Sequence, residues 1–252
     1  MGCRPSTFPM DKNAKLQKND EDKRADAHKY RRLVGRLLYL QATRPDITYS
    51  VNVLSQFATD PRESHMNAAM RVLRYLKATL AQGILLTKEV EANLIAYTDS
   101  DWLGCPDTKR LMTGYLLLLG GAPISWKSKR QFVVSRSSAK PEYRAMATTV
   151  SEVIWLRWLL KELGIEQSDP TQLLCDNMAM KHIANNPVFH ESTEHVEMDC
   201  YFVCECVESK EVKPLHIDTK SQVADLFTKA LGAKQLQSLL DKLGICNLHA
   251  PT

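Results

Sequence analysis

Apolar residues recur at helical spacing in three successive segments at the start of the chain. Residues 30–43 carry leucines three and four positions apart, which predicts a helix that Pro45 ends, because proline disfavours helical geometry at the residue before it. Two more segments of the same period follow. We expect Asp46 to cap the second helix and Ser64 to cap the third, since both residue types accept hydrogen bonds from the first helical N–H groups.

After Gly83 the hydrophobic period changes towards two, which favours strands. Three strands joined by short turns precede a long helix that Gly164 ends, and strands then alternate with helices. The expected strands are residues 94–99, 114–119, 123–127, 172–175 and 212–217, and the expected helices are residues 138–163, 195–208, 223–227 and 236–243, with a further one through Met180 and Ile183. This order predicts an α/β fold, in which one mixed five-stranded sheet carries helices on its faces and follows a small helical segment.

The distribution of apolar residues divides the chain into four expected regions. Residues 1–28 are polar, offer little apolar surface to bury and are expected to form a flexible N-terminal arm. Residues 29–90 form the helical segment, and residues 91–232 form the sheet domain. Residues 233–252 are expected to form a C-terminal helix and tail.

Composition places the chain among ordinary globular proteins. Its 252 residues are 44% hydrophobic and 25% charged. Seven cysteines without the spacing of a disulfide framework predict free thiols in a reducing compartment. No apolar run is long enough to span a membrane. We therefore expect an intracellular protein, cytoplasmic or nuclear, that is not secreted and has no membrane partner.

The net charge of +4 permits a phosphate-bearing partner without requiring one. Arg71, Arg74 and Lys77 fall on the polar surface of the third expected helix. A solvated basic face and a contact with a nucleic-acid backbone are both compatible with this pattern.

Four carboxylates fall at the same kind of position in this expected fold. Asp99 ends the first strand, Asp176 ends the fourth, Glu142 lies in the first turns of the long helix, and Asp225 opens the helix after the fifth strand. Strand ends and helix N-termini meet along one edge of an open sheet, so all four can converge. Oxygen ligands without His or Cys select Mg²⁺ or Mn²⁺. Two such ions can stabilise the attacking and leaving oxygens of a phosphoryl displacement, which is the chemistry of a nuclease.

Distinctive segments surround these carboxylates. They are Tyr97-Thr98-Asp99-Ser100-Asp101-Trp102, Ile124-Ser125-Trp126-Lys127-Ser128-Lys129-Arg130-Gln131, Val134-Ser135-Arg136-Ser137-Ser138-Ala139, Cys175-Asp176-Asn177, Asn186-Pro187-Val188-Phe189-His190-Glu191 and Ala224-Asp225-Leu226-Phe227-Thr228-Lys229-Ala230-Leu231-Gly232. In this order they resemble the ribonuclease H domain at the C-terminal end of the Pol polyprotein of copia-type LTR retrotransposons. Upstream, Tyr30-Arg31-Arg32-Leu33-Val34-Gly35, Thr43-Arg44-Pro45-Asp46-Ile47 and Arg74-Tyr75-Leu76-Lys77 resemble the end of the reverse transcriptase. The resemblance covers nearly the whole chain.

The resemblance implies a ribonuclease H-like fold and hydrolysis of the RNA strand of an RNA/DNA hybrid. Carried over position by position, the family's catalytic, metal-binding carboxylates fall on Asp99, Glu142, Asp176 and Asp225, which would hold two Mg²⁺ or Mn²⁺ ions. The expected partners are the hybrid and a reverse transcriptase domain or subunit. The residues expected to contact nucleic acid are Arg136, Ser137, Ser138 and Asn177. For the two serines, helix capping and turn chemistry are an equally good interpretation.

The chain departs from the family's pattern close to Glu142. Lys140-Pro141 stands where Glu-Ala is usual, which puts a cation near the expected site and can shift the turn that positions Glu142. Glu194 and Cys204 stand where basic residues are usual, and the loop at residues 218–222 has no His. A catalytically inactive nucleic-acid-binding remnant is therefore the alternative to an active enzyme. A transposase or resolvase that uses the same acids is a weaker third hypothesis.

Two other groups of residues have structural interpretations. The spacing of Cys200, Cys204 and Cys206 with His195 is not that of a zinc finger or ribbon, so a zinc site is disfavoured. Trp155 and Trp158 are expected to pack in the core or between domains rather than to stack on bases.

Overall fold

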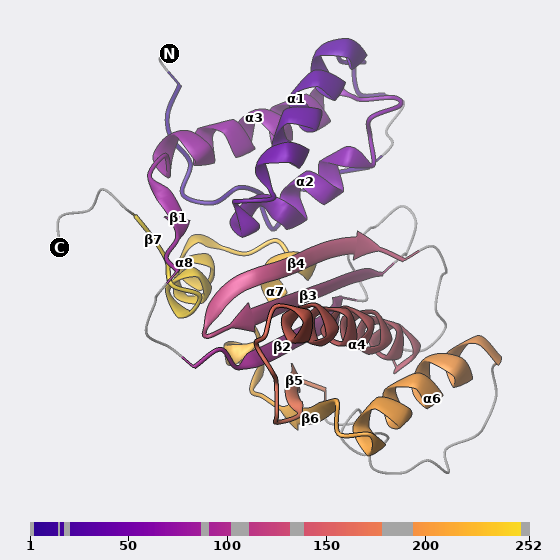
Figure 1. The fold of residues 1–252 in the computed structure, drawn as a ribbon. Coiled ribbons are helices and arrows are strands. Elements are labelled where there is room, and N and C mark those ends of the chain that lie inside the picture. The colour runs from indigo at the N-terminus through magenta and orange to yellow at the C-terminus, as the bar shows by residue number, and fades with distance from the viewer. Residues whose placement is uncertain are drawn as a thin grey trace.

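The chain folds into helices on both faces of a central sheet, as Figure 1 shows. The computed structural model describes residues 3–14, 16–17, 21–86, 91–101, 111–131, 139–177 and 194–247, apart from the side chains of residues 139–140 and 194–197. The expected helix through Met180 and Ile183 lies outside the described residues.

Three helices, α1 (Ala27–Leu40), α2 (Thr48–Ser55) and α3 (Glu63–Ala78), form the helical segment, with a 3₁₀ turn η1 (Pro45–Ile47) before α2. Asp26 caps α1, because its carboxylate accepts hydrogen bonds from the backbone N–H groups of His28 and Lys29, each at 3.0 Å. The three helices predicted from the hydrophobic period are confirmed.

The caps predicted for α2 and α3 are wrong. Asp46 lies inside η1, where its buried carboxylate pairs with the Arg44 guanidinium at 2.6 Å and accepts a hydrogen bond from the Tyr75 hydroxyl at 2.7 Å. A buried guanidinium needs a counter-ion, so Asp46 serves Arg44 instead of the helix. Ser64 lies in the first turn of α3, and Arg62 occupies the N-cap position.

The central sheet has the strand order β4-β3-β2-β5-β6. Its strands are β2 (Leu94–Asp101), β3 (Met112–Leu119), β4 (Ala122–Arg130), β5 (Thr171–Cys175) and β6 (Val212–His216). The hairpin strands β2, β3 and β4 pair antiparallel, whereas β5 pairs parallel with both β2 and β6. The predicted mixed five-stranded α/β sheet is therefore confirmed.

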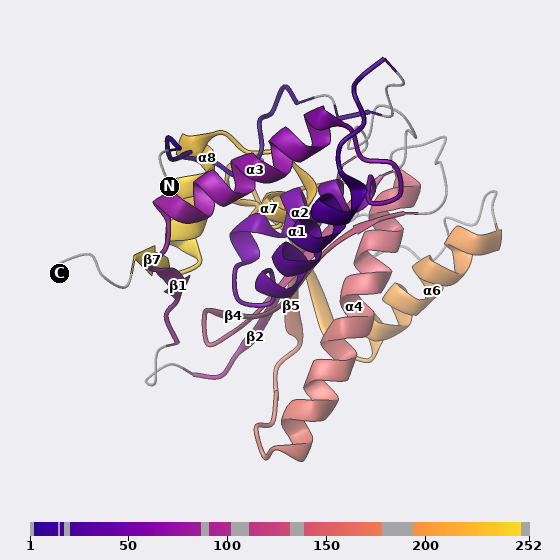
Figure 2. The same cartoon turned by 90° about the horizontal axis from the view of Figure 1, so that it is seen from above.

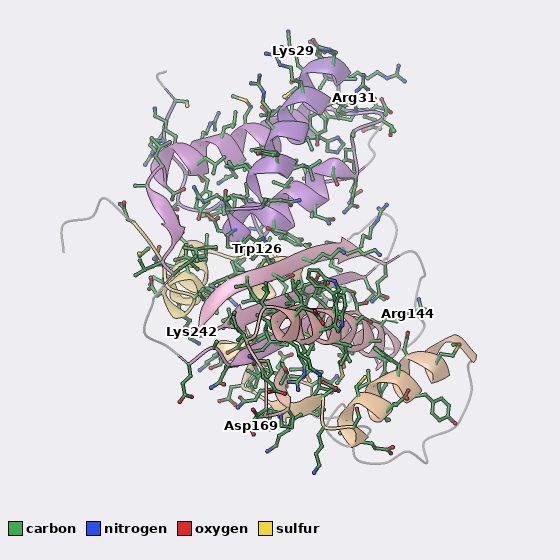
Figure 3. The ribbon with its side chains drawn as sticks, viewed as in Figure 1. Lys29, Arg31, Trp126, Arg144, Asp169 and Lys242 are labelled. Carbon is green, nitrogen blue, oxygen red and sulfur yellow. The ribbon has the colours of Figure 1, made fainter. Side chains whose placement is uncertain are left out.

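Two helices, α4 (Ala139–Glu162) and α6 (Glu194–Glu208), cover one face of the sheet. Gly164 lies two residues after the end of α4 and adopts a positive φ of 78°. Arg144 of α4 pairs with Asp199 of α6 at 3.7 Å, and Figure 3 shows Arg144 on the side of α4 near α6. The expectation that Trp155 and Trp158 pack inward is wrong: they are 51% and 61% exposed, because they lie on the face of α4 that points away from the sheet.

The helical segment packs on the other face of the sheet, as the view from above in Figure 2 shows. Alternate side chains of β3 belong to the two cores: Leu116 lies with the helical segment and Leu117 lies with α4. Trp126 of β4 joins the layers directly, because its indole N–H donates to the Gln41 carbonyl at 3.0 Å (Figure 3). The helical segment and the sheet thus share one core, and the domain boundaries remain a prediction.

A second, two-stranded sheet was not predicted. β1 (Gln82–Ile84) pairs antiparallel with β7 (Ile245–Asn247), so the chain after α3 lies beside the chain after α8 (Ala233–Lys242). A further 3₁₀ turn, η2 (Thr219–Ser221), and the short helix α7 (Asp225–Thr228) connect β6 to α8. Strands of three residues have no measurable period, which is why the sequence pattern did not reveal them.

The first residues of the chain lie on the basic face of α3. The Ser6 backbone N–H donates to the Arg74 carbonyl at 3.2 Å, the Lys77 ammonium donates to the Cys3 carbonyl at 3.2 Å, and Met10 is 5% exposed. The Arg71 guanidinium lies 4.8 Å from the centroid of the Phe8 ring. The flexibility predicted for the N-terminal arm, residues 1–28, stays a prediction. None of the described helices is both long enough and apolar enough to cross a membrane.

Candidate active site

Close packing of α7 against the sheet sets the surroundings of Asp99. Asp99 lies near the end of β2, opposite Gly114 of β3, and is 8% exposed. A Cβ atom on Gly114 would lie 2.7 Å from both Phe227 Cβ and Thr228 Cγ2, so only glycine lets α7 come this close. As a consequence, the Thr228 hydroxyl donates a hydrogen bond to Asp99 Oδ2.

The buried side chain of Gln222 holds the start of α7 against β2. Its Nε2 donates to the Thr98 carbonyl at 3.0 Å, and its Oε1 accepts from the Ala224 N–H at 3.1 Å. Asp225 follows as the first residue of α7 and is 2% exposed. The network therefore brings the carboxylate of Asp225 to the strand that carries Asp99.

Lys229 connects these two carboxylates. Its ammonium lies 2.6 Å from Asp225 Oδ1 and 3.3 Å from Asp99 Oδ2. The lysine side chain is 32% exposed, while those of the two aspartates are 6% and 3% exposed. One cation at the edge of the core thus pairs with two buried carboxylates from different elements and offsets one of their two negative charges.

Glu142 enters the site from the first turn of α4 and accepts a hydrogen bond on Oε2 from the Asn177 side-chain amide. Pro141 lies in the same turn, where its missing N–H costs no helical hydrogen bond, and its carbonyl accepts from Gln131 Nε2 at 3.1 Å. The Lys140-Pro141 departure therefore leaves Glu142 in the first turn of the helix.

Asp99, Glu142 and Asp176 line one hollow of about 230 Å³, a volume that includes space open to solvent. Asp176 follows β5 directly, and Asn177 comes next in the chain. The other lining residues are Thr98, Ser100, Ala145, Met146, Cys175 and Asn177. Asp225 is outside this lining and adjoins it through Lys229 and Asp99.

Asp99 and Asp176 repel both of the other site carboxylates, Glu142 and Asp225. Burial raises the pKa of Glu142 to about 7, with repulsion from Asp99 and Asp176 adding to the effect and the Asn177 hydrogen bond opposing it. Burial likewise raises the pKa of Asp225 to about 6, against the opposing effect of Lys229 and with repulsion from Asp99 and Asp176. Burial alone would lower the pKa of Lys229, yet Asp99 and Asp225 raise it above its usual value.

The oxygen-only donor set fits a hard divalent cation such as Mg²⁺. In the part of the chain that the structure describes, however, no three His, Cys, Asp or Glu side chains are grouped closely enough to hold a metal ion. Asp99 and Asp225 are instead satisfied by Thr228 and Lys229. A metal ion would require these side chains to change partners. The same observation gives no support to a zinc site among the described cysteines.

Of the residues expected to contact nucleic acid, Asn177 lies in the hollow, while Arg136, Ser137 and Ser138 lie outside the described residues. Sequence reasoning missed the roles of Gly114, Gln222 and Lys229. Lys229 carried a usable signal, because it stands four residues after Asp225, a spacing that suits an ion pair. Gly114 and Gln222 carried none, since their roles depend on contacts far along the chain.

No family model matches the chain. The chain is 43% identical over 243 residues to the retrovirus-related Pol polyprotein from transposon RE1 of Arabidopsis thaliana and 33% identical over 217 residues to that from transposon TNT 1-94 of Nicotiana tabacum. These alignments cover 96% and 86% of this chain, but only 17% and 16% of the polyproteins.

Among solved structures, the chain is similar to LC11-RNase H1 in complex with an RNA/DNA hybrid, with 13% identity and a TM-score of 0.41 over 54% of this chain and 94% of that chain. The relatives whose sequences align along nearly all of this chain carry the identification. The chain belongs to the family of retrovirus-related Pol polyproteins from copia-type transposons and spans less than a fifth of their length.

Proposed function

We propose that this chain is a ribonuclease H that cuts the RNA strand of an RNA/DNA hybrid with the help of two divalent metal ions. The observation that supports the proposal is the hollow that Asp99, Glu142 and Asp176 line together, with Asp225 joined to Asp99 through Lys229. Asp99, Glu142 and Asp225 belong to β2, α4 and α7, and Asp176 follows β5 directly. Repulsion from Asp99 and Asp176 adds to the raised pKa of both Glu142 and Asp225. A purely structural role would not require two buried carboxylates, Asp99 and Asp225, beside the half-buried Glu142 and Asp176.

The metal ions, when bound, would supply Lewis-acid stabilisation of the attacking and leaving oxygens. The four carboxylates would hold them, and hydrogen bonds from neighbouring side chains would orient the carboxylates. Asn177 holds Glu142, and Thr228 holds Asp99. Because the hollow is partly closed and lined by Ala145 and Met146, the carboxylates keep a lower local dielectric than they would have in water.

The proposed substrate follows from family membership and from the site. The relatives are Pol polyproteins of transposons. We therefore propose that the partner of this chain is a reverse transcriptase domain or subunit. We propose that Arg136, Ser137, Ser138 and Asn177 contact the hybrid at its phosphates and ribose 2′-hydroxyls. Asn177 supports this role by its place on the wall of the hollow beside Glu142.

The test is cleavage of an end-labelled RNA/DNA hybrid by the purified chain in Mg²⁺, followed on a denaturing gel. We expect cutting of the RNA strand alone, stopped by a chelator, with single-stranded RNA and duplex DNA left intact. The matched control is Asp99→Asn, which removes a charge and keeps the side-chain volume. Equal cutting by both proteins would assign the activity to a contaminant and contradict the proposal.

The second candidate is an inactive remnant that binds nucleic acid without cutting it. Two observations favour it: Lys140-Pro141 departs from the family's pattern, and Lys229 already occupies the oxygens of Asp99 and Asp225. This candidate predicts that the hybrid shifts in a native gel while its RNA stays intact in both Mg²⁺ and Mn²⁺. Cleavage that Asp99→Asn abolishes would exclude it.

A further inference from the structure

Among the described residues, Lys229 is the one cationic side chain that contacts the site carboxylates directly. The proposed function gives it no role. It follows α7 directly, and its ammonium contacts Asp225 Oδ1 at 2.6 Å and Asp99 Oδ2 at 3.3 Å. Both aspartate side chains are nearly inaccessible to solvent, so each needs a cation or a proton in the folded chain. Lys229 supplies one positive charge to the pair.

The same carboxylates are assigned to metal binding. Mg²⁺ takes oxygen ligands at roughly 2.0–2.1 Å and requires nearly octahedral geometry. An ammonium that touches Asp225 and Asp99 both occupies ligand oxygens and repels an incoming divalent cation. The described residues also show no group of carboxylates that is already close enough to hold a metal ion. The arrangement with Lys229 in place is therefore one that binds metal weakly.

The side chain of Lys229 has solvent-accessible space beside it. Its side chain is 32% exposed, and it lines a second hollow of about 240 Å³, partly open to solvent, between the helical segment and α8. Tyr49, Ser50 and Leu236 lie on the other walls of this hollow. A lysine has a flexible four-carbon stem, so its ammonium can leave the carboxylates for solvent without any movement of the backbone.

We propose that Lys229 is a positioning residue that holds Asp99 and Asp225 together before metal arrives and that leaves them when a divalent cation binds. This inference rests on the proposed function, because it assumes that these carboxylates are metal ligands. Metal loading is then an exchange of one cation for another. The lysine keeps the empty site folded and raises the metal concentration needed to fill it.

The first experiment measures metal binding by titration calorimetry with Mg²⁺ and Mn²⁺ alone, and thermal unfolding in chelator and in Mg²⁺. Lys229→Met removes the charge and keeps most of the stem, Lys229→Arg keeps the charge, and Lys234→Met removes an exposed lysine of α8 as the matched control. We expect Lys229→Met to melt at a lower temperature in chelator and to bind Mg²⁺ at least about fivefold more tightly. The control should match the unaltered chain.

The second experiment needs no variant, so it remains decisive if Lys229→Met fails to fold. The unaltered chain is treated briefly with an amine-acetylating reagent in chelator and in saturating Mg²⁺, and the modification of Lys229 is quantified by mass spectrometry against Lys234. We expect Lys229 to become more reactive when Mg²⁺ binds, since its ammonium has left the carboxylates. Unchanged or reduced reactivity would overturn the exchange.

These outcomes separate the two proposals. If the unaltered chain and Lys229→Met bind Mg²⁺ equally, or if the variant binds more weakly, Lys229 is not the displaced cation and only this inference fails. If neither protein binds a divalent cation, the proposed metal centre fails and the exchange fails with it. If only Lys229→Met binds, the lysine blocks the site in the unaltered chain without being displaced, so the exchange is overturned while the proposed metal-binding role of the carboxylates stands.

Discussion

At the scale of single residues, the burial of a carboxylate makes the stability of the folded chain depend on pH. Glu142 has a folded-state pKa of about 7, above its ordinary value of 4.5, because burial and the neighbouring aspartates disfavour its charge. Between these two pH values the folded chain binds more protons at Glu142 than the unfolded chain does. The free energy of unfolding contributed by this group therefore falls as pH rises from about 4.5 to about 7.

The prediction is that the metal-free chain loses stability across this range and that Glu142→Gln loses less. Urea unfolding in chelator at several pH values between 4.5 and 7.5 would measure both curves. Asp225 contributes in the same direction, between its ordinary 3.8 and about 6, in both proteins. Parallel curves for the two proteins would show that Glu142 titrates normally in the folded chain.

Gly114 offers a second test at this scale. In Gly114→Ala the new methyl group would lie 2.7 Å from atoms of Phe227 and Thr228, so α7 must move away from β3. We expect a loss of about 1–3 kcal/mol in the free energy of unfolding, typical of overpacking. Gly35→Ala is the matched control, because nothing lies within 4 Å of its added Cβ and alanine favours the helix α1. Equal stability of the two variants would contradict this view of α7.

At the scale of elements, a buried ion pair secures the turn between α1 and α2. The Arg44 guanidinium pairs with Asp46 and also donates to the Thr79 carbonyl at 3.0 Å and to its hydroxyl at 2.7 Å. Tyr75 donates to the same Asp46 carboxylate at 2.7 Å. The cluster joins η1 to the end of α3, so it fixes how the helices of this segment pack together.

We predict that Arg44→Met lowers the free energy of unfolding by about 3–5 kcal/mol, because Asp46 would remain buried without its cation. Arg24→Met is the matched control: Arg24 pairs with Asp60 at 3.6 Å on the surface, and loss of an exposed pair costs about 1 kcal/mol at most. Chemical denaturation of both variants would compare them. A small effect for Arg44→Met would mean that Asp46 finds another partner or a proton.

The elements also show what sequence pattern can predict here. Long periodic runs identified the helices around Leu37 and Val150 and the strands of the main sheet, because burial of one face imposes the period. Because strand ends share an edge, the pattern also placed Asp99 and Asp176 near Glu142, and these three line one hollow, whereas Asp225 lies outside its lining. The metal-binding role of the four carboxylates stays a prediction. Caps such as Asp46 were mispredicted, because a distant buried cation outweighed the local preference. The pairing of Lys229 with Asp99 joins residues 130 positions apart, so no local pattern could reveal it.

At the scale of the whole molecule, the shared core makes the helical segment and the sheet interdependent. Leu116, Leu118 and Phe227 are buried against the helices, and β3 is buried over most of its length. The helices α1, α2 and α3 are thus part of the structure that supports the candidate site, even though all four site carboxylates come from later in the chain.

We predict that a shortened chain beginning at residue 91 aggregates or unfolds at low temperature, because it would expose the apolar face of β3 and α7. Light scattering and thermal melting would measure this beside the full chain, which we expect to unfold in one transition. A soluble shortened chain with a cooperative melt would show that the sheet domain is independent.

The double-sided burial of β3 also bears on the order of synthesis. A ribosome makes the chain from its N-terminus, so α1, α2 and α3 emerge before any strand of the main sheet. Their apolar surfaces can therefore pack against the hairpin of β3 and β4 while the rest of the chain is still being translated. The nascent hairpin would then be sheltered from water on one face before α4 arrives to close the other.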